Sequence, residues 1–525
     1  MRIRVIGGGL AGPEAALTAA RLGCQVDLYE MRAVIDGKPR LTPAHQTTEF
    51  GELVCSNSLK SESPNTAPWL LKQEMRRAGS ALLQIADTTA VPAGHALAVD
   101  RVEFSRRIAE AIAAEPNIRV FREEVTSLVQ DEEGPKGCTI LATGPLTSDA
   151  LSAEIARITG SEHLAFYDSI SPIVDADSID MDRVYMAARW DKGTADYINC
   201  PMDREEFDRF LDALLAAEAA EAKEWEKLDY FEGCLPIEVL ARRGRDTLRF
   251  GPMKPVGLRD PRTGRTPWAV VQLRKENLRA DSYNLVGFQN HLKFGEQARV
   301  LRLIPGLENA RFLRFGQIHR NTYICAPALL DETLRLKSAP EGPLPLDELL
   351  RLNPAPEGRS ENSPGQAKRS PGAERKETPG APEGRSEPAP ILFAGCPTLS
   401  APYAERVGGQ QTILFAGQLS GVEGYTESIA TGLLAGIYAA ALAQGREPIP
   451  APRACALGSL VHYITHADPK RFQPANITFD LLEPLEEELR KKVRDKKERH
   501  RIVCERALAA FDGWWKVAGP ASPKL

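Results

Sequence analysis

The chain has 525 residues, 43% of them hydrophobic and 26% charged, a composition typical of a folded protein with more than one domain. Its formal net charge is −5, so contacts with a nucleic acid would have to come from local basic patches and not from an overall positive field. The nine cysteines form no CxxC pair, which argues against a zinc site and against a secreted disulfide framework. We therefore expect no bound metal.

The start of the chain lacks the apolar core and the cleavage site of a signal peptide. The longest apolar stretch, 429–442, is short and rich in Ala and Gly, which favours a packed helix over a membrane span. These features predict a cytoplasmic protein that makes no contact with a membrane.

A βαβ unit is predicted at the beginning of the chain. Residues 2–6 have the pattern of a short buried strand, 13–22 of a helix, and 25–29 of a second strand that ends on Glu30. A glycine-rich turn joins the first strand to the helix, and it consists of Gly7, Gly8, Gly9, Leu10, Ala11 and Gly12. Strand, glycine turn, helix and terminal acid together predict a binding site for a dinucleotide.

Each part of this turn has a separate task in such a site. Gly7 allows the tight turn, Gly9 allows the pyrophosphate to approach the backbone, and Gly12 allows the helix to pack against the sheet. The free N–H groups and the dipole at the start of the helix favour the phosphate charge. Glu30 is placed to accept both ribose hydroxyls, so the ligand is expected to carry an ADP moiety.

Two distant segments have the pattern of further strands of the same sheet. Residues 137–145 form a buried strand that runs into a turn at Gly144, and residues 412–418 form another that ends at Gly417 and Gln418. A small-residue helix is predicted to follow at 427–442. The pattern is similar to that of two-dinucleotide flavoproteins, although Gln418 replaces their usual Asp. The predicted fold class is therefore α/β, with a Rossmann-like FAD-binding domain of the two-dinucleotide flavoprotein type.

The remaining segments predict how the chain is divided. The FAD-binding domain takes 1–180, then 306–352 and 391–445, and an inserted α+β domain takes 181–305. In the inserted domain a helical run at 204–227 alternates with Arg-rich, strand-like pieces at 247–251 and 268–274.

Two further segments complete this division. Residues 353–390 lack aromatic residues and Val, Ile and Leu, which predicts a disordered insert rich in Pro, Gly and Ser. Residues 446–525 are predicted to be a helical region that packs on the inserted domain.

Two cysteines lie in polar, turn-forming surroundings. Cys55 is followed by Ser56 and Asn57, and Lys60 would favour its thiolate if it lay close by. Cys234 lies in a Gly-Cys pair framed by two carboxylates. A cysteine is most often a small buried apolar residue, and local sequence leaves that reading and a catalytic one equally open for both.

Candidate substrate contacts come from basic and aromatic runs. His319 and Arg320 lie in a run of rings, cations and amides that suits a planar heterocycle, although a structural loop explains it equally well. Arg242 and Arg243 begin a basic cluster suited to phosphates. The basic run 490–501 follows three glutamates at helical spacing, which favours a solvated helix with internal ion pairs.

With these residues laid out, the chain closely resembles the folate- and FAD-dependent tRNA (uracil-5-)-methyltransferases of bacteria. The matching stretches are 7–14, 52–59, 167–174, 231–238, 251–258, 319–323 and 415–425, and Gln418 fits this family. The resemblance implies that C5 of the T-loop uridine in tRNA is methylated, with methylenetetrahydrofolate as carbon donor and NAD(P)H as reductant through FAD.

The resemblance also implies roles for the two cysteines. Cys234 would add to C6 of the uracil, while Cys55 beside the flavin would take the C5 proton or guard the adduct. No obligate protein partner is expected. Two alternatives remain open at this stage: an FAD-dependent enzyme that modifies the wobble uridine of tRNA, and a flavin oxidoreductase that acts on small molecules.

Overall fold

The computed structural model describes residues 2–42, 44–128, 137–160, 164–191, 194–220, 235–337 and 412–519, with the backbone alone at 164–169 and 318–321. Its α-helices are α1 Ala11–Arg21, α2 Ala67–Arg77, α3 Ala81–Thr88, α4 Arg101–Ala114, α5 Asp149–Thr159, α6 Arg204–Ala216, α7 Ile237–Arg242, α8 Thr247–Phe250, α9 Phe294–Leu301, α10 Ala326–Leu329, α12 Tyr425–Ala443, α13 Ala456–His466, α14 Glu487–Lys492 and α15 Lys496–Ala518.

The strands fall into separate sheets. They are β1 Ile3–Ile6, β2 Val26–Tyr29, β3 Ala33–Ile35, β4 Lys38–Arg40, β5 Ser58–Ser61, β6 Ala90–Val91, β7 Ala96–Val99, β8 Ile118–Phe121, β9 Cys138–Leu141, β10 Leu164–Ser169, β11 Ile173–Asp175, β12 Tyr185–Ala187, β13 Tyr197–Met202, β14 Ala269–Lys275, β15 Ser282–Leu285, β16 Phe312–Arg314, β17 Ile318–Tyr323 and β18 Thr412–Phe415. Short 3-10 helices include η1 Gly144–Leu146, η3 Arg189–Asp191, η6 Gly417–Ser420 and η7 Pro469–Arg471.

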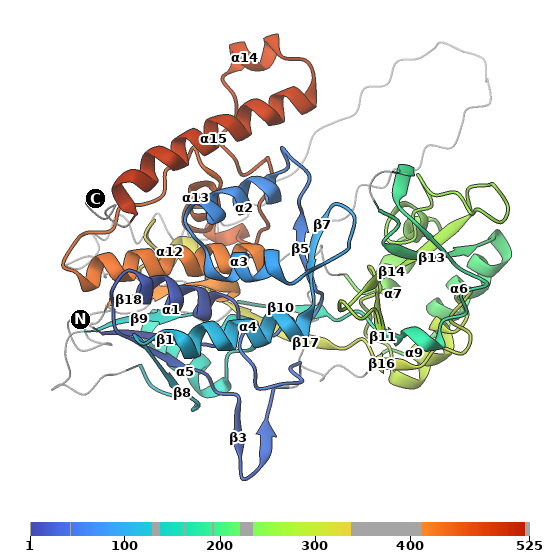
Figure 1. The fold of residues 1–525 in the computed structure, drawn as a ribbon, viewed down its shortest axis with the longest axis horizontal. Helices are drawn as coiled ribbons and strands as arrows, with labels where there is room; N and C mark the ends of the chain where they lie inside the picture. The colour runs from blue at the N-terminus through green and yellow to red at the C-terminus, as the bar shows by residue number, and fades with distance from the viewer. Residues whose placement is uncertain are drawn as a thin grey trace, which may run out of the picture. The chain divides into compact units, whose positions relative to one another are not determined.

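A five-stranded parallel sheet unites the three segments that the sequence predicted. Its order is β18-β9-β1-β2-β8, and β1 pairs in parallel with β2 on one side and β9 on the other. α1 connects β1 to β2, which completes the predicted βαβ unit (Figure 1). The carboxyl ends of β1, β9 and β18 therefore meet at one edge of the sheet, where a dinucleotide binds in folds of this kind.

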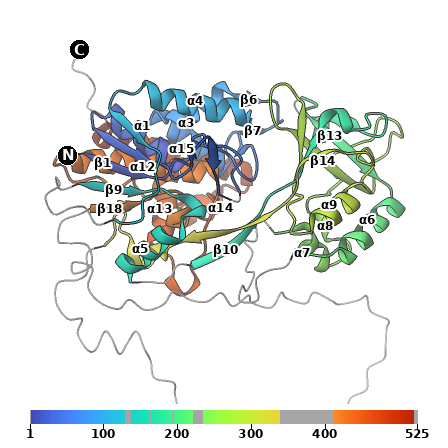
Figure 2. The ribbon, with the colours of Figure 1, turned by 90° about the horizontal axis from the view of Figure 1, so that it is seen from below.

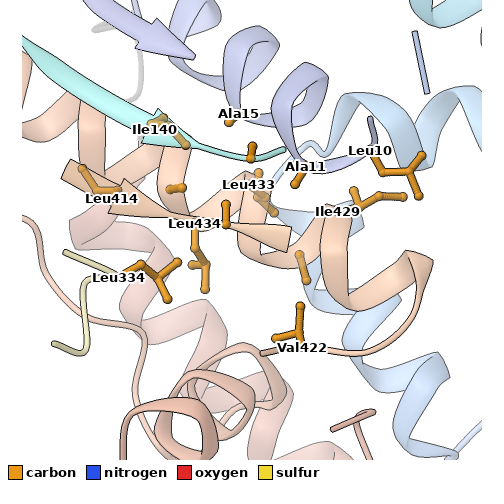
Figure 3. Close-up of a cluster of buried hydrophobic side chains, with 14 of the residues drawn as sticks. Leu10, Ala11, Ala15, Ile140, Leu334, Leu414, Val422, Ile429, Leu433 and Leu434 are labelled. Atoms are coloured by element: carbon orange, nitrogen blue, oxygen red, sulfur yellow. The ribbon is translucent and has the colours of Figure 1, made fainter. Parts of the chain in front are cut away.

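Helices α1 and α12 pack closely because small residues line their contact. A Cβ added at Gly432 would overlap the carbonyl oxygen of Ala11, and one added at Gly436 would lie 2.7 Å from that of Ala15. Figure 3 shows the apolar core around this contact. Among the described residues, α12 is the one helix long and apolar enough to cross a membrane, and 83% of its most apolar window is buried in the protein.

The inserted region forms its own six-stranded sheet, in the order β12-β13-β14-β15-β11-β16. This sheet begins at Ile173 and ends at Arg314, so it is wider than the predicted 181–305. The prediction of a strand-like piece at 247–251 is wrong: Thr247–Phe250 is the short helix α8, whose Leu248 is buried in the core of the inserted domain. The antiparallel pair β10 and β17 runs outside both sheets (Figure 2).

The C-terminal helices do not pack where the sequence analysis placed them. Phe511 and Trp514 of α15 lie in the apolar core around the parallel sheet and not in that of the inserted domain. The N-terminus of α13 is anchored there as well, because Glu74 of α2 accepts the N–H groups of Ala456 (2.7 Å) and Leu457 (2.8 Å). A buried carboxyl group that accepts two free N–H groups fixes the start of a helix.

Hydrogen bonds join the inserted domain to the segment around Cys55. Asn57 Nδ2 donates to the carbonyl oxygen of Lys275 (2.9 Å), and Arg274 Nη2 donates to Ser56 Oγ (3.3 Å). Both bonds come from the end of β14. The end of β14 is therefore where the inserted domain contacts the polar turn after Cys55, which the sequence predicted as a candidate site.

Candidate active site

A cavity of about 350 Å³ lies at the carboxyl edge of the parallel sheet. Nine residues predicted to bind the cofactor line it, namely Gly7, Gly8, Gly9, Leu10, Ala11, Glu30, Gly144, Gly417 and Gln418. Cys55 lines it as well. The structure thus brings four distant segments of the sequence around one space.

The glycine turn has the shape that a pyrophosphate needs. Gly7 has φ +117°, and a Cβ added at Gly12 would overlap the carbonyl oxygen of Gly7, so neither position accepts a side chain. A Cβ added at Gly9 would meet no atom within 4 Å, because this position faces open space. No side chain caps the N-terminus of α1, which leaves its N–H groups available to an anion. The turn fits a dinucleotide.

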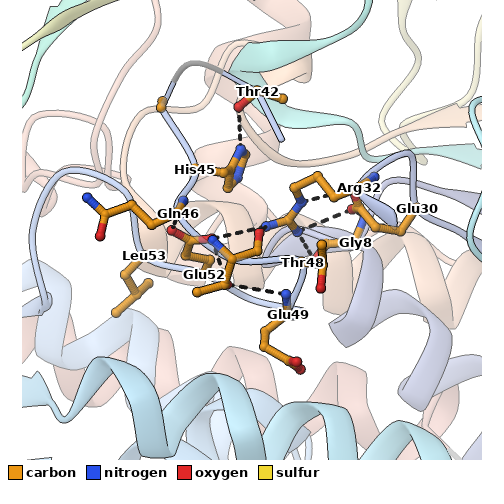
Figure 4. A network of polar contacts seen from close by, with 12 residues as sticks. Gly8, Glu30, Arg32, Thr42, His45, Gln46, Thr48, Glu49, Glu52 and Leu53 are labelled. Carbon is orange, nitrogen blue, oxygen red and sulfur yellow. Dashed lines mark hydrogen bonds and ion pairs between the residues drawn. The ribbon is translucent and has the colours of Figure 1, made fainter. Parts of the chain in front are cut away.

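Glu30 belongs to a buried polar network (Figure 4). Its Oε2 accepts the N–H of Gly8 (2.6 Å), and its Oε1 accepts the backbone N–H (2.8 Å) and Nε (2.9 Å) of Arg32. Burial would raise the pKa of Glu30, but the charge and hydrogen bonds of Arg32 outweigh it and hold the pKa below its usual range. The carboxylate is ionised at the cavity wall, and its bond to ribose remains a prediction.

Arg32 is a site residue that the sequence analysis missed. Its side chain is 2% exposed, and it also contacts Glu52 Oε2 at 3.3 Å. Because Glu52 accepts the N–H groups of Gln46 (2.8 Å) and Thr47 (3.1 Å), the network ties Glu30 to the loop before Cys55. An Arg two residues after an acid gives no recognisable signal in a single sequence.

The opposite wall comes from the segment after β18. The N–H of Gly417 donates to Thr431 Oγ1 (2.8 Å), and Gln418 Nε2 donates to Glu423 Oε2 (2.7 Å). These bonds hold η6 against the start of α12. The backbone of Gly417 and the side chain of Gln418 are thereby fixed at the cavity.

Cys55 is half-buried and lies against Tyr425, the first residue of α12. Tyr425 Oη accepts the N–H groups of Cys55 (2.8 Å) and Ser56 (3.3 Å), and lies 3.0 Å from Cys55 Sγ. Since two N–H groups occupy the lone pairs of the oxygen, the hydroxyl hydrogen is left to donate to Sγ. Burial, followed by the nearby Cys55, raises the pKa of Tyr425 well above its usual value, so the hydroxyl keeps its proton.

Two arginines direct positive charge at Cys55. Arg101 of α4 forms an ion pair with Glu276, and its charge interacts with Cys55 and with Tyr425. Arg314 of β16 donates to the carbonyl oxygen of Ala44 (2.9 Å), and its charge also interacts with Cys55. A donated O–H and two cations favour negative charge on the sulfur, as in reactive cysteines.

The sequence analysis expected Lys60 to favour the thiolate of Cys55 if it lay close by. Lys60 Nζ pairs with Glu427 Oε1 at 2.6 Å and contacts Asn476 Oδ1, so its charge is taken up at the start of α12. The Lys60 side chain lines the same cavity, so its effect on Cys55 remains a prediction, and the charges of Arg101 and Arg314 also act on the sulfur. Arg101 and Arg314 lie 46 and 259 residues away along the chain, which is why the local sequence did not reveal them.

Among the other predicted site residues, Arg242 and Arg243 do not line this cavity. Cys234 and the side chains of His319 and Arg320 lie outside the described residues, so their roles remain predictions. Arg242 and Arg243 are exposed at the end of α7. Their neighbour Arg245 is neutralised by Asp208 (3.0 Å) and Asp212 (2.7 Å).

One group of potential metal ligands lies outside the cavity. Glu332, His462 and His466 have ligand atoms within 4.8 Å of one another, and His466 Nδ1 lies 2.9 Å from Thr465 Oγ1. Its histidines are four residues apart on α13, whereas the sequence analysis considered cysteine pairs alone. The expected absence of a metal remains a prediction.

Comparison with known proteins places the chain in a family. The model of the family glucose inhibited division protein A matches residues 2–341 and 406–447. The methylenetetrahydrofolate--tRNA-(uracil-5-)-methyltransferase TrmFO of Koribacter versatilis is 60% identical, with 98% of both chains covered. The protein of the same name from Solibacter usitatus is 55% identical, with 97% of this chain and 98% of that one covered.

Among solved structures, Aquifex aeolicus GidA in its form II crystal is similar, with a TM-score of 0.62. The identity is 16% over 99% of this chain and 74% of that one, so this likeness bears on the fold alone. The parallel sheet, its glycine turn and the cavity define a Rossmann-like FAD-binding protein with an inserted α+β domain, as the sequence predicted. Within that class, the chain belongs to the family of methylenetetrahydrofolate--tRNA-(uracil-5-)-methyltransferases TrmFO. The resemblance noted from the sequence is confirmed.

Proposed function

We propose that this protein methylates C5 of the T-loop uridine in tRNA, with methylenetetrahydrofolate as carbon donor and NAD(P)H as reductant through FAD. The observation that carries the proposal is the near full-length match at 60% identity to a relative named for this chemistry. The cavity that combines a dinucleotide turn with Cys55 supports it. The proposed setting is the cytoplasm.

FAD is proposed to lie along the carboxyl edge of the parallel sheet. The N–H groups of the Gly7–Gly12 turn and of α1 would hold the pyrophosphate, and Glu30 would hold the ribose. Gly144, Gly417 and Gln418 would contact the rest of the cofactor from β9 and β18. When bound, FAD would supply the hydride that completes the methyl group.

The uracil needs a nucleophile because its C5 carries little electron density until a group adds at C6. We assign this role to Cys234: its sulfur bonds to C6, the electron pair moves to C5, and C5 attacks the one-carbon unit. Removal of the C5 proton would then break the bond between the one-carbon unit and its carrier nitrogen, and hydride addition to the resulting methylene would expel the sulfur from C6. A base is therefore needed beside C5.

Cys55 is suited to accept that proton. The Tyr425 hydroxyl donates to Sγ, and the charges of Arg101 and Arg314 favour the thiolate, so the sulfur is a ready acceptor. Tyr425 itself keeps its proton and serves to position and polarise the sulfur. The pair thus holds a base at the wall of the cavity.

Mass spectrometry of unmodified tRNA after incubation with the enzyme, FAD, NAD(P)H and methylenetetrahydrofolate tests the reaction. The expected result is one added methyl group on a T-loop uridine. Product at the wobble position, or a requirement for a partner GTPase, would favour the wobble-uridine alternative. Consumption of NAD(P)H with no change in tRNA would favour a small-molecule oxidoreductase.

The roles of Cys55 and Cys234 can be distinguished by trapping the enzyme on 5-fluorouridine tRNA. This tRNA carries fluorine in place of the C5 proton, so the base cannot remove a proton there. Wild-type enzyme should form a covalent complex with this tRNA. Cys234→Ala should abolish the complex, whereas Cys55→Ala should still form it but should fail to methylate normal tRNA. An undiminished complex with Cys234→Ala would overturn the assignment.

A further inference from the structure

Trp190 is an exposed aromatic residue whose backbone is in an unusual conformation. It lies in η3, in the turn between β12 and β13 of the inserted domain, and 64% of its surface is exposed. Its φ is +61°, and that of the following Asp191 is +51°. Two successive residues other than glycine in the left-handed region mark a turn that its surroundings hold in place.

Contacts from the neighbouring loop hold this tryptophan. Its N–H donates to the carbonyl oxygen of Gly257 (2.6 Å), and a Cβ added at Gly257 would lie 2.8 Å from the indole Nε1. One part of the ring is therefore packed on the backbone of Gly257, and the rest faces solvent. Arg189 fixes the turn by donating to the carbonyl oxygen of Val256 (2.7 Å) and to Gln272 Oε1 (2.8 Å).

The loop that supports the ring also carries positive charge. Lys254 and Arg259 flank Gly257 on this loop, both are exposed, and neither makes an ion pair with any residue that the structure describes. Arg311 of the same domain, by contrast, is paired with Asp175 at 2.5 Å. An exposed ring supported by a loop with two cations offers both a stacking surface and contacts for phosphates.

Strand β14 connects the turn of Trp190 to the segment that lines the cavity at Cys55. Gln272, which accepts from Arg189, and Arg274 are two residues apart on β14, so their side chains share one face and lie roughly 7 Å apart. Arg274 in turn donates to Ser56 Oγ, next to Cys55 (3.3 Å). These hydrogen bonds therefore link the turn that carries Trp190 to the segment of Cys55 through one face of β14.

We propose that Trp190 is a stacking platform for an unpaired base of the tRNA substrate, with Lys254 and Arg259 in contact with the phosphates on either side. The inference rests on the proposed function, because it names how that substrate is held. Loop bases of RNA are unstacked and are commonly bound on aromatic side chains. The contacts of Trp190 and Arg189 with the Gly257 loop already hold the ring in place before a base binds.

Binding of unmodified tRNA to the FAD-loaded enzyme tests the platform. Trp190→Ala should weaken tRNA binding about tenfold, and Trp190→Phe should restore most of the affinity because phenylalanine also stacks. Lys254→Gln and Arg259→Gln should each reduce the slope of log Kd against log salt by about 0.7. Arg311→Gln is the matched control and should leave the slope unchanged, since its charge is already paired.

Fluorescence supplies a signature that a purely structural role would not give. Binding of tRNA should quench indole emission in wild type, and this component of the quenching should be absent from Trp190→Phe. The flavin spectrum and the thermal midpoint of each variant report whether it is folded.

Unchanged tRNA affinity in folded Trp190→Ala, or equal quenching in wild type and Trp190→Phe, would overturn the inference. Wild-type enzyme that fails to methylate tRNA at all would instead overturn the proposed function.

Discussion

The glycine turn and the surroundings of Cys55, two parts of the same site, are built in different ways. The glycine turn at Gly7–Gly12 is one continuous segment that offers backbone N–H groups and empty space. The surroundings of Cys55 are instead assembled from α4, β16 and α12, through Arg101, Arg314 and Tyr425. Binding of a phosphate needs a backbone shape that six residues can encode, whereas tuning a thiol needs charges that no short segment can supply.

This difference predicts how single substitutions should affect each part of the site. Because Gly7 and Gly12 have no room for a side chain, a single methyl group added at either position should disturb the fold and the cofactor together. The surroundings of Cys55 instead depend on pairs of side chains, so that removing one member should leave the fold in place and change the chemistry or the stability by a smaller amount.

The largest effect is expected for Gly12→Ala. The new Cβ would overlap the carbonyl oxygen of Gly7, so β1 and α1 would have to separate, at a cost above about 3 kcal/mol. Flavin absorbance per protein and thermal unfolding measure the loss. Gly9→Ala is the control: its Cβ meets no protein atom, so the fold should survive while FAD content falls. Wild-type FAD content in folded Gly12→Ala would contradict this account of the turn.

Arg101→Met should have the next largest effect. It leaves Glu276, whose side chain is 5% exposed, without its ion-pair partner, which should lower the free energy of unfolding by about 3 kcal/mol. Urea unfolding measures the change. Arg106→Met on the same helix is the control, because its pairs with Glu103 and Glu110 are exposed and its removal should leave stability nearly unchanged. Equal effects of the two substitutions would contradict the assigned role of Arg101.

Tyr425→Phe should reduce the methylation rate more strongly than it reduces the stability of the protein. The backbone N–H groups of Cys55 and Ser56 lose their acceptor, which costs about 1–2 kcal/mol, and Sγ loses its donated hydrogen bond. We expect methylation in a single turnover to slow at least about tenfold while FAD content is kept. An unchanged rate in a variant with normal FAD content would remove Tyr425 from the mechanism.

The smallest effect is a pH dependence at Glu74, which anchors α13. Burial raises its pKa from 4.5 to about 8, so its contribution to stability is full below pH 4.5 and is lost as the pH rises through about 8. Between pH 6 and pH 7 the wild-type free energy of unfolding should fall relative to Glu74→Gln by about 1 kcal/mol. Parallel pH profiles for the two proteins, measured by urea unfolding, would show that Glu74 does not titrate in this range.

The sequence predicted the parallel sheet well because its signals are local. Alternating strand, turn and helix patterns located β1, α1, β2, β9 and β18, and the small-residue pattern at 427–442 predicted the buried helix α12. The sequence did not predict the position of elements that depends on which distant residues they pack against. The C-terminal helices were assigned to the wrong core, since an apolar face such as that of Phe511 and Trp514 does not specify what it packs against.

The sequence by itself determined the dinucleotide turn, the family and the two cysteines worth testing, because each is written in consecutive residues. Only the tertiary structure decided what surrounds Cys55. It directed the charge of Lys60 to Glu427, brought Arg101 and Arg314 to the thiol, and placed the Tyr425 hydroxyl on Sγ. The physical reason is that Coulomb interactions and hydrogen bonds depend on distance in space, which the order of residues along the chain does not fix.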